Sequence, residues 1–349
     1  MGYFSQFGGQ IKSHHKETYA RSPQWDGSKF VNLEETVMEF SWSEMPEFVR
    51  KQFFEKSQRE PAHPLPIAPF QAEAFLAPSD SMKCIWYGHS VVLMRLAGKT
   101  LLIDPMLGPN ASPIAPFATR RFSEGSLELI EAFPQIDAVL FTHDHYDHLD
   151  YASIQRLVPK TTQYFVALGV GRHLMEWGIP EEKITEFDWW EALQWGDIHL
   201  TFTPSRHFSG RGLTDRAKSL WGGWAFRTER EKLLFSGDGG YGEHFKEIGQ
   251  RLGPFDFGWM ECGQYNKNWH QIHMYPEESV QAALDARVAQ AMPVHWGGFA
   301  LAQHDWFEPA DRFAAAAQTQ QLQTDYPGMG ILFSYQQERL TTPWWPELR

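Results

Sequence analysis

Three histidines and an aspartate within six positions form the part of this sequence best suited to chemistry. The run is His143, His145, Asp147 and His148, and it directly follows residues 136–141, a short apolar stretch typical of a buried strand. Residues two apart on an extended backbone point to the same side, so His143 and His145 can reach one cation at about 2.0–2.1 Å. Asp147 and His148 lie beyond the strand, at a turn, and can serve a second cation. The run therefore predicts half of a two-metal site.

Single residues of the same kinds recur at the ends of later apolar runs. His207 follows residues 199–205, and His295 follows residues 291–294. Asp238 ends a third run, and the glycines on both sides of it let the backbone approach a metal closely. One isolated histidine or aspartate of this kind is usually a hydrogen-bonded core or turn residue. A series of such positions, each at the end of a predicted strand, instead favours one metal centre.

The order of these residues is similar to that of a known superfamily. HxHxDH followed by His, Asp and His resembles the metallo-β-lactamase superfamily of binuclear metallohydrolases. Several blocks rich in tryptophan and glycine look more specifically like the N-acylphosphatidylethanolamine-hydrolysing phospholipases D and their bacterial relatives. The blocks are residues 86–90, 102–105, 188–191, 220–224, 253–256 and 295–301. The resemblance implies an α+β fold, the αββα sandwich, in which two mixed β-sheets pack together between outer helices.

The resemblance also implies a role for each candidate ligand. It divides the histidines and aspartates between two metals that share one carboxylate. The first metal takes His143, His145 and His207, the second takes Asp147, His148 and His295, and Asp238 bridges the two. A shared carboxylate of this kind can hold two cations about 3.5–4 Å apart around a bridging hydroxide.

Asp147 and His273 are the candidate catalytic residues. His273 lies in a loop before a predicted helix and matches a family position linked to catalysis. An imidazole has a pKa suited to a general acid for the leaving alkoxide, and His270, close by, is an alternative. Ile272 and Gly239 depart from the polar residue and the threonine expected in the phospholipases. These departures leave the substrate open, but not the metals.

Four further residues are candidates for supporting the ligands or contacting the substrate: His89, Asp104, Tyr146 and Tyr265. Asp104, at a strand end, and His89, after a glycine, can orient ligand imidazoles through the second hydrogen bond of each ring. A turn or capping role is the alternative for Asp104. The fifteen tryptophans could line a groove for acyl chains, but aromatic residues are first of all core material.

The ligand types limit the cofactor and the reaction. Nitrogen and oxygen ligands without a thiolate suit two zinc ions best, and they also admit iron or manganese. Such a pair ionises water near neutral pH and neutralises charge on phosphodiester oxygens. For the lipid implied by the resemblance, attack at phosphorus releases an N-acylethanolamine or similar alcohol and leaves phosphatidic acid. A lactonase or other carboxyl-ester hydrolase is one alternative, and a non-catalytic, metal-bound lipid-binding scaffold is another.

Composition narrows the partners and the location. The 349-residue chain has a net charge of −12, which argues against nucleic-acid binding because that requires clustered Lys and Arg. Cys84 and Cys262 lie in apolar contexts and are expected to be buried and free, as in a reducing cytosol. We see no signal peptide and no run as long as a membrane span, so we expect a cytoplasmic protein. Peripheral membrane contact and a homodimer are both left open.

Residues 1–80 are expected to form an extended arm packed on a catalytic domain of residues 81–349. Five prolines punctuate residues 61–78 of the arm. Apolar residues at helical spacing over residues 45–53, with basic residues nearby, predict a short helix that either packs on the domain or lies on a membrane surface.

From residue 82 onward, short strands alternate with helices. The predicted strands include residues 83–87, 91–96 and 99–103, and the predicted helices are residues 126–133, 152–158 and 276–288, with Asp150 as the N-cap of the second. Residues 99–104 and 232–238 echo each other in form. Such an echo is typical of two stacked sheets with pseudo-repeated halves.

Overall fold

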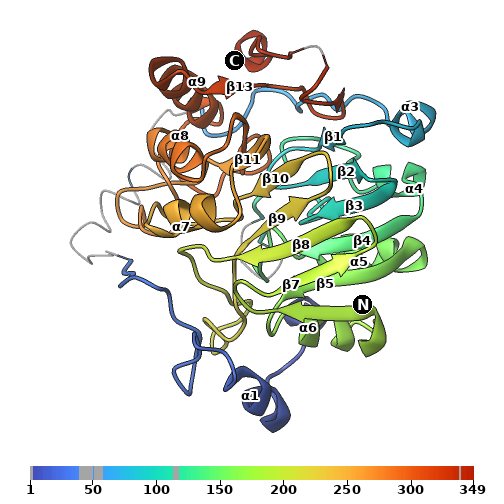
Figure 1. The fold of residues 1–349 in the computed structure, drawn as a ribbon, viewed down its shortest axis with the longest axis vertical. Coiled ribbons are helices and arrows are strands. Elements are labelled where there is room, and N and C mark those ends of the chain that lie inside the picture. Colours follow the sequence, from blue (N-terminus) through green and yellow to red (C-terminus); the bar gives the residue numbers. More distant parts are fainter. Residues whose placement is uncertain (1–2, 39–49, 51–57, 113–117, 338) are drawn as a thin grey trace.

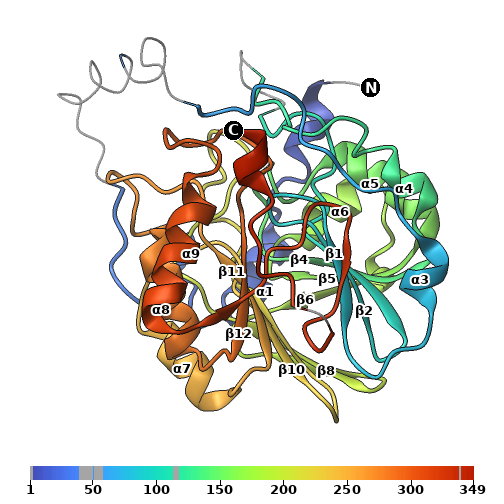
Figure 2. The ribbon, with the colours of Figure 1, turned by 90° about the horizontal axis from the view of Figure 1, so that it is seen from above.

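The computed structural model describes residues 3–38, 50, 58–112, 118–337 and 339–349. Within them, two seven-stranded sheets have the orders β14-β1-β2-β3-β4-β5-β6 and β13-β12-β11-β10-β9-β8-β7. Figure 2 shows the layers: α3, α4, α5 and α6 lie outside the first sheet, and α7, α8 and α9 lie outside the second. The predicted αββα sandwich is confirmed.

The first sheet changes from antiparallel to parallel pairing at its centre. β14, β1, β2 and β3 pair antiparallel, whereas β3, β4, β5 and β6 pair parallel. Its strands are β1 (Lys83–Trp86), β2 (Val92–Leu96), β3 (Lys99–Ile103), β4 (Ile136–Phe141), β5 (Thr161–Ala167), β6 (Ile184–Phe187) and β14 (Leu332–Phe333).

The second sheet repeats this arrangement. β7 to β10 pair antiparallel and β10 to β13 pair parallel, so β3 and β10 occupy equivalent positions. The predicted echo between residues 99–104 and 232–238 falls on these two strands. The strands are β7 (Ala192–Trp195), β8 (Ile198–Thr203), β9 (Gly223–Arg227), β10 (Lys232–Phe235), β11 (Phe257–Glu261), β12 (Gln290–Val294) and β13 (Gln323–Thr324).

The helices are short, and most of them cover the outer faces of the sheets. Figure 1 places α1 and α9 at opposite ends of the long axis. The α-helices are α1 (Ser13–Tyr19), α3 (Ala72–Leu76), α4 (Leu129–Ala132), α5 (Tyr151–Leu157), α6 (Gly171–Glu176), α7 (His244–Arg251), α8 (Pro276–Asp285) and α9 (Glu308–Gln320). The 3₁₀ turns are η1 (Tyr3–Phe7), η3 (Val158–Lys160), η4 (Glu181–Lys183) and η5 (Trp345–Leu348).

The predicted helices exist, but two of them are shorter than expected. α5 begins after Asp150, whose carboxylate accepts hydrogen bonds from the amides of Ala152 and Ser153, so the predicted N-cap is confirmed. α4 stops at its C-cap Phe133, which is extended because a proline follows it. α8 ends at Asp285 because Arg287 adopts a left-handed conformation with φ of 60°.

Several segments of the arm lie on the domain. The buried Tyr19 packs against the rings of Trp25 and Phe30, and the amide of Leu65 donates to the carbonyl of Phe122. The helix predicted over residues 45–53 lies outside the described residues, apart from residue 50. The boundary between an arm of residues 1–80 and a domain of residues 81–349 stays a prediction.

The large side chains form the core that positions the site. Six tryptophans are among the largest fully buried residues: Trp86, Trp221, Trp224, Trp259, Trp296 and Trp345. Most of the aromatic side chains are thus core material. Cys84 and Cys262 are buried and free, as predicted. Among the described residues, no helix combines the length and the apolar character needed to cross a bilayer.

Candidate metal centre

One edge of the sandwich collects the candidate ligands. In the first sheet, β1, β3 and β4 run in the same direction, because β2 pairs antiparallel with both β1 and β3, and β4 pairs parallel with β3. In the second sheet, β8, β10, β11 and β12 run in the same direction, because β9 pairs antiparallel with both β8 and β10, and β11 and β12 continue in parallel. The C-terminal ends of the parallel strands of one sheet therefore share an edge. The residues that follow these strands are His89, Asp104, His143, His207, Asp238 and His295, with Glu261 as the last residue of β11.

A first group of ring nitrogens lies just beyond β4. His143 Nε2 is 2.9 Å from His145 Nδ1, which is 3.2 Å from His207 Nε2. Two nitrogen ligands of a tetrahedral zinc ion, each about 2.0–2.1 Å from the metal, lie about 3.3 Å apart. The three predicted ligands thus converge as they would around one cation.

A second group contains His89, Asp147, His148 and His295. Asp147 Oδ2 is 2.9 Å from His89 Nε2 and 3.5 Å from His148 Nε2. The three histidines are buried, whereas Asp147 is half-buried. We expected His89 to orient a ligand, but the structure places its ring nitrogen among the candidate ligands themselves.

Asp238 contacts both groups. Its Oδ2 lies 2.9 Å from His148 Nε2 and 3.9 Å from His143 Nε2, and its Oδ1 lies 3.2 Å from His295 Nδ1. Gly237, just before it, has a φ of 65°, and a Cβ there would stand 2.1 Å from a backbone oxygen. The glycine is therefore required where the chain turns Asp238 into the site.

Hydrogen bonds fix the orientation of two ligand rings. Asp104 Oδ2 lies 2.8 Å from His148 Nδ1, and the same carboxylate accepts hydrogen bonds from the amide and the hydroxyl of Thr142. His207 Nδ1 donates to the carbonyl of Ile272 at 2.9 Å. In both rings the bond at Nδ1 leaves Nε2 directed at the cluster, as in metal-binding histidines.

Three of these residues adopt an unfavourable backbone conformation. His89, Asp104 and His295 have φ of 54°, 42° and 66°, in the left-handed region. Each such residue costs of order 1–3 kcal/mol, and residues of this kind cluster at functional sites. The strain is supported by two hydrogen bonds that join the segments: the amide of His295 donates to the carbonyl of His89, and the amide of His89 donates to the carbonyl of Trp296.

Burial sets the protonation of the cluster. It lowers the pKa of His143, His207 and His295 well below the ordinary value, so these rings are neutral at pH 7. Burial also acts to lower the pKa of His148, but three surrounding carboxylates outweigh it and raise that pKa well above the ordinary value. Burial raises the pKa of Asp238 to about 6. Neutral imidazoles beside buried carboxylates are the state that a divalent cation stabilises.

The buried ring of His295 has one unpaired nitrogen. Its Nδ1 lies 3.2 Å from Asp238 Oδ1, whereas its Nε2 is among the buried atoms of the described residues that have no hydrogen-bond partner. Buried polar atoms almost always have a partner. Together with a donor set of imidazoles and carboxylates, this nitrogen fits a divalent cation such as zinc.

His273, the predicted general acid, lies beside the cluster. Its ring is centred 4.9 Å from that of His207 and 5.2 Å from that of His295. Burial lowers the pKa of His273 to about 3, with Asp147 acting in the opposite direction. The role of His273 as a general acid stays a prediction.

Sequence reasoning missed Glu261, which stands behind His273. Its Oε1 lies 2.8 Å from His273 Nδ1, and its Oε2 accepts a hydrogen bond from the amide of Met274. The carboxylate is buried, which raises its pKa well above the ordinary value. A glutamate as the last residue of a buried strand was the available signal.

The two predicted tyrosines point away from the cluster. Tyr146 donates its hydroxyl to the carbonyl of Arg211 at 2.6 Å and lies under the Arg211 guanidinium. Tyr265 donates to Glu308 at the start of α9 and stacks on His304. Tyr146 therefore supports the ligand loop from behind, while Tyr265 belongs to the contact with α9.

Asp144 was also missed, although it lies between two ligands. It is fully buried, and its carboxylate accepts hydrogen bonds from the Ser219 hydroxyl and the Gly210 amide, with His173 Nε2 3.2 Å away. Burial alone would raise its pKa, but the contact with His173 and the charge of Arg172 outweigh this effect and hold the pKa far below the ordinary value. The alternation of an extended chain that aims His143 and His145 at the cluster aims Asp144 the other way.

The arm reaches the site through Asn32. Its Oδ1 accepts a hydrogen bond from the amide of His207 at 3.1 Å, and its Nδ2 donates to the carbonyl of the same residue at 2.8 Å. Trp221 Nε1 also donates to Asn32 Oδ1. A residue of the arm thus fixes the backbone of a candidate ligand.

A groove of about 460 Å³ opens between this part of the arm and the domain. It begins at His207 and contains the cation of Arg216, which lies 3.9 Å over the ring of Phe208. Apolar residues of the lining include Phe30, Val31, Leu33, Met38, Ala217, Trp221 and Ile272. Lys29, Glu34 and Glu35 also line the groove, so it carries charges of both signs beside the apolar surface. The groove is a candidate site for a substrate with an apolar chain and a polar or charged group.

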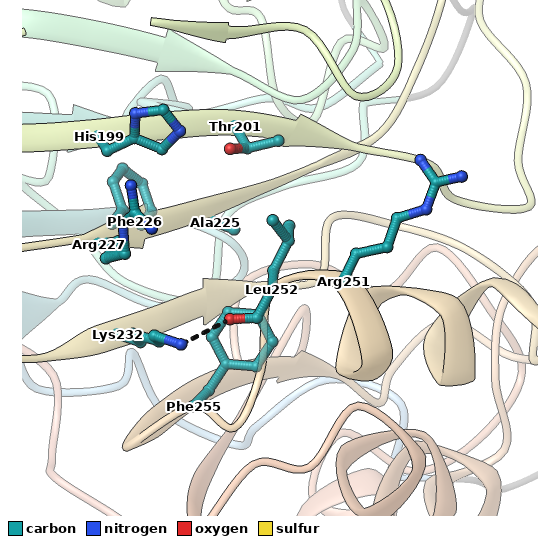
Figure 3. Close-up of a pocket in the computed structure, with 9 residues that line it drawn as sticks. All are labelled: His199, Thr201, Ala225, Phe226, Arg227, Lys232, Arg251, Leu252 and Phe255. Carbon is teal, nitrogen blue, oxygen red and sulfur yellow. Dashed lines mark hydrogen bonds between the residues drawn. The ribbon is translucent and has the colours of Figure 1, made fainter. Parts of the chain in front are cut away.

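A second, smaller pocket lies on the second sheet and shares no residue with the candidate metal groups (Figure 3). His199, Arg227 and Lys232 form one row across β8, β9 and β10. Lys232 Nζ donates to the carbonyls of Leu252 and Gly253 just beyond α7, as Figure 3 shows for Leu252. The lysine therefore caps the negative end of that helix.

Histidine and aspartate clusters at the strand ends of an αββα sandwich define a metal-dependent hydrolase. The chain matches the family described as Beta-lactamase superfamily domain over residues 99–296. It is also similar to Igni18, a metallo hydrolase from Ignicoccus hospitalis, with a TM-score of 0.55 and 18% identity over 73% of this chain and 99% of that chain. The chain belongs to the β-lactamase superfamily.

Two curated relatives share more of the sequence. An uncharacterized protein of Mycobacterium tuberculosis is 36% identical over 330 residues, which are 93% of this chain and 88% of that protein. N-acyl-phosphatidylethanolamine-hydrolyzing phospholipase D 1 of Caenorhabditis elegans is 31% identical over 261 residues, which are 71% of this chain and 73% of that protein. The resemblance to these phospholipases that the sequence motifs indicated is confirmed.

Proposed function

We propose that the protein is a two-metal phosphodiesterase of the phospholipase D type, which cleaves a glycerophospholipid to phosphatidic acid and an N-acylethanolamine or similar alcohol. The observation that carries the proposal is the position of Asp238, whose two oxygens face both groups of candidate ligands. Two cations held there, most suitably zinc, supply a hydroxide near neutral pH and neutralise the phosphodiester. The similarity to the Caenorhabditis elegans phospholipase supports the substrate class.

The residues of the chain divide the remaining work. His143, His145 and His207 hold the first cation, and Asp147, His148 and His295 hold the second, with His89 as a further donor. Asp104 keeps the His148 ring in its orientation through Nδ1. Arg216, at the entrance to the groove, offers a positive charge to the phosphate, because a guanidinium pairs well with phosphate oxygens.

The groove beside His207 supports a lipid substrate. Six large apolar side chains are exposed in the described part of the chain, and three of them, Leu33, Val37 and Met38, lie on the arm next to this groove. Exposed apolar side chains that gather at the rim of a binding site are typical of contact with lipid. We therefore propose that this rim meets a membrane surface or dispersed lipid, and that the groove receives an acyl chain.

The test compares three substrates on the purified, metal-loaded protein: N-acylphosphatidylethanolamine, an acyl-homoserine lactone and a simple soluble phosphodiester. Phosphatidic acid as the product of the first supports the proposal. Ring opening of the lactone without phosphodiester cleavage would instead identify a carboxyl-ester hydrolase, and no turnover of any of the three would favour a non-catalytic lipid-binding scaffold.

Asp238→Asn is the matching variant test. We expect it to lose at least one metal and to lower activity about a thousandfold or more, because a catalytic cation contributes several kcal/mol to transition-state stabilisation. Asp325→Asn is the control, since Asp325 is equally buried after β13 but pairs with Arg339. An Asp238→Asn protein that retains two metals by elemental analysis would contradict the bridging role.

A further inference from the structure

The ligand loop, residues 143–149, carries candidate ligands on one face, and Arg211 packs against the other face. The candidate ligands are residues 143, 145, 147 and 148, whereas Arg211 contacts the residues between and just after them. Its Nη1 donates to the carbonyls of Asp144 and Leu149, both at 2.7 Å. Its guanidinium covers the ring of Tyr146 at 4.0 Å, and its own carbonyl accepts the Tyr146 hydroxyl.

The same guanidinium is held from outside by the N-terminal segment, residues 5–9. Arg211 Nε and Nη2 both donate to the carbonyl of Gln6, at 3.1 and 2.8 Å. The segment itself is fixed on the domain, because Trp177 Nε1 donates to the carbonyl of Ser5 and Arg172 Nε donates to the carbonyl of Gly9. Arg211 therefore joins the start of the chain to the back of the ligand loop.

This arrangement is costly as a purely structural device. Arg211 is 2% exposed, and its hydrogen bonds within the described residues go to carbonyl oxygens, with no carboxylate in ion-pair contact. Burying a charge without a direct counter-ion is expensive, and it lowers the pKa of this guanidinium. A guanidinium, however, has its donors in fixed positions, so it can hold two carbonyls of one loop at a set separation. The flexible ammonium group of a lysine cannot do this.

We propose that Arg211 is the positioning residue of the metal centre, and that the N-terminal segment acts through it to retain the metals. The inference rests on the proposed assignment of residues 143, 145, 147 and 148 as metal ligands. By tying a carbonyl within the ligand run, that of Asp144, and the carbonyl just after it, that of Leu149, to one guanidinium, Arg211 keeps the ligands at their spacing.

The test measures metal binding, not turnover. The full-length protein is loaded with cobalt, whose visible spectrum reports ligand geometry, and the rate of metal loss to a chelator is followed for Arg211→Lys and Arg211→Met. We expect metal loss to be about 10–100-fold faster in both variants, the range found when partners of metal ligands are removed. We also expect an altered cobalt spectrum.

Arg339→Met is the control for lost stability. Arg339, like Arg211, holds a segment of the chain in place. It binds the side chain of Asp325 and the carbonyl of Thr324, but it contacts no candidate ligand. We expect its cobalt spectrum and its rate of metal loss to match those of the unaltered protein. If Arg211→Met does not fold, Arg211→Lys, which keeps the charge, still decides the question.

Gly8→Val tests the role of the N-terminal segment. Gly8 has a φ of 71°, and a Cβ there would stand 2.2 Å from His173 Nδ1, so the substitution displaces the segment without altering Arg211. We expect faster metal loss in this variant and little additional effect when it is combined with Arg211→Met.

Two outcomes of these experiments distinguish the metal assignment from the positioning role of Arg211. Unaltered protein that binds no metal would overturn the metal assignment itself, and with it the proposed function. Normal metal binding with unchanged chelation rates and cobalt spectra in both Arg211 variants would overturn the positioning role alone.

Discussion

Asp104 shows how a carboxylate outside the candidate metal groups can orient a candidate ligand. It accepts two hydrogen bonds from Thr142 and meets His148 at Nδ1, and it does so with a left-handed backbone. Thr142 holds the Asp104 carboxylate in place, and the carboxylate holds the ring of His148 in its orientation. The orientation of His148 is thus set before any cation arrives.

Asp104→Asn is expected to weaken metal binding or activity about 10–100-fold, because the amide removes the negative charge that orients and polarises the His148 ring. Metal affinity by competition with a chelator, together with kcat, measures the effect. Asp137→Asn is the control, since Asp137 accepts the Thr100 amide on the same sheet far from any candidate ligand. Equal behaviour of the two variants would assign Asp104 to the turn alone.

The candidate ligands were predictable from the sequence because ligand chemistry and strand ends leave a local signal. The structure brings all seven of them together, although their roles as ligands stay predictions. The sequence did not identify Glu261 and Asp144 as residues of the site, because an isolated acidic residue gives the same signal in a sequence whether its side chain faces solvent, a histidine or an arginine. Only the fold reveals that Glu261 stands behind His273 and that Asp144 faces Ser219 and His173.

Among the elements, the strands formed by clear apolar runs could be predicted from the sequence. The strands with a short or weak apolar pattern could not. β4 (Ile136–Phe141) and β3 (Lys99–Ile103) have their predicted bounds, since each is mostly buried and ends in at least three consecutive apolar residues. β7, with alternately exposed residues, and the two-residue strands β13 and β14 carry too short a pattern to be recognised. They exist because the neighbouring strands offer unpaired edges.

Helix α7 carries a titratable group that makes stability depend on pH. Its first residue, His244, is buried, and burial together with Arg206 lowers its pKa to about 3. The unfolded chain, with a pKa of about 6.5, therefore binds the proton more tightly than the folded chain. Stability contributed by neutral His244 is complete above pH 6.5 and is lost as the pH falls from about 6.5 towards 3.

We expect the unaltered protein to lose about 2 kcal/mol more stability than His244→Gln between pH 7.5 and pH 5. Urea unfolding of both proteins at the two pH values measures the difference, and the comparison cancels any loss of metal that the two proteins share. Parallel pH dependence in both proteins would mean that His244 is accessible to protons in the folded state.

At the scale of the whole molecule, the arm is part of the site. Asn32 fixes the backbone of His207, and Leu33 and Met38 of the arm line the groove. The sequence indicated an arm packed on the core, but it gave no sign that one of its residues would bind the backbone of a ligand. A single asparagine in a polar stretch is indistinguishable from a turn residue. Peripheral membrane contact and a homodimer stay predictions.

Leu33→Asp is expected to lower kcat/KM on phospholipid vesicles about tenfold and to leave hydrolysis of a soluble phosphodiester unchanged. The reason is that the leucine, 53% exposed, gains of order 1.5 kcal/mol when lipid covers it, and the aspartate forfeits this gain. Leu76→Asp is the matched control, because Leu76 is 40% exposed on α3 and does not line the groove. An equal loss for both variants would show that the effect is general surface charge.

Each candidate group draws on both halves of the sandwich. His143 and His145 follow a strand of the first sheet and meet His207 from the second, while His89, Asp147 and His148 meet His295, which follows β12. A nascent chain leaving the ribosome therefore cannot complete the second group until β12 has emerged and folded. The first group, by contrast, has all its residues once His207 has been made, so a translation product that ends before residue 295 contains one complete candidate group and lacks the other.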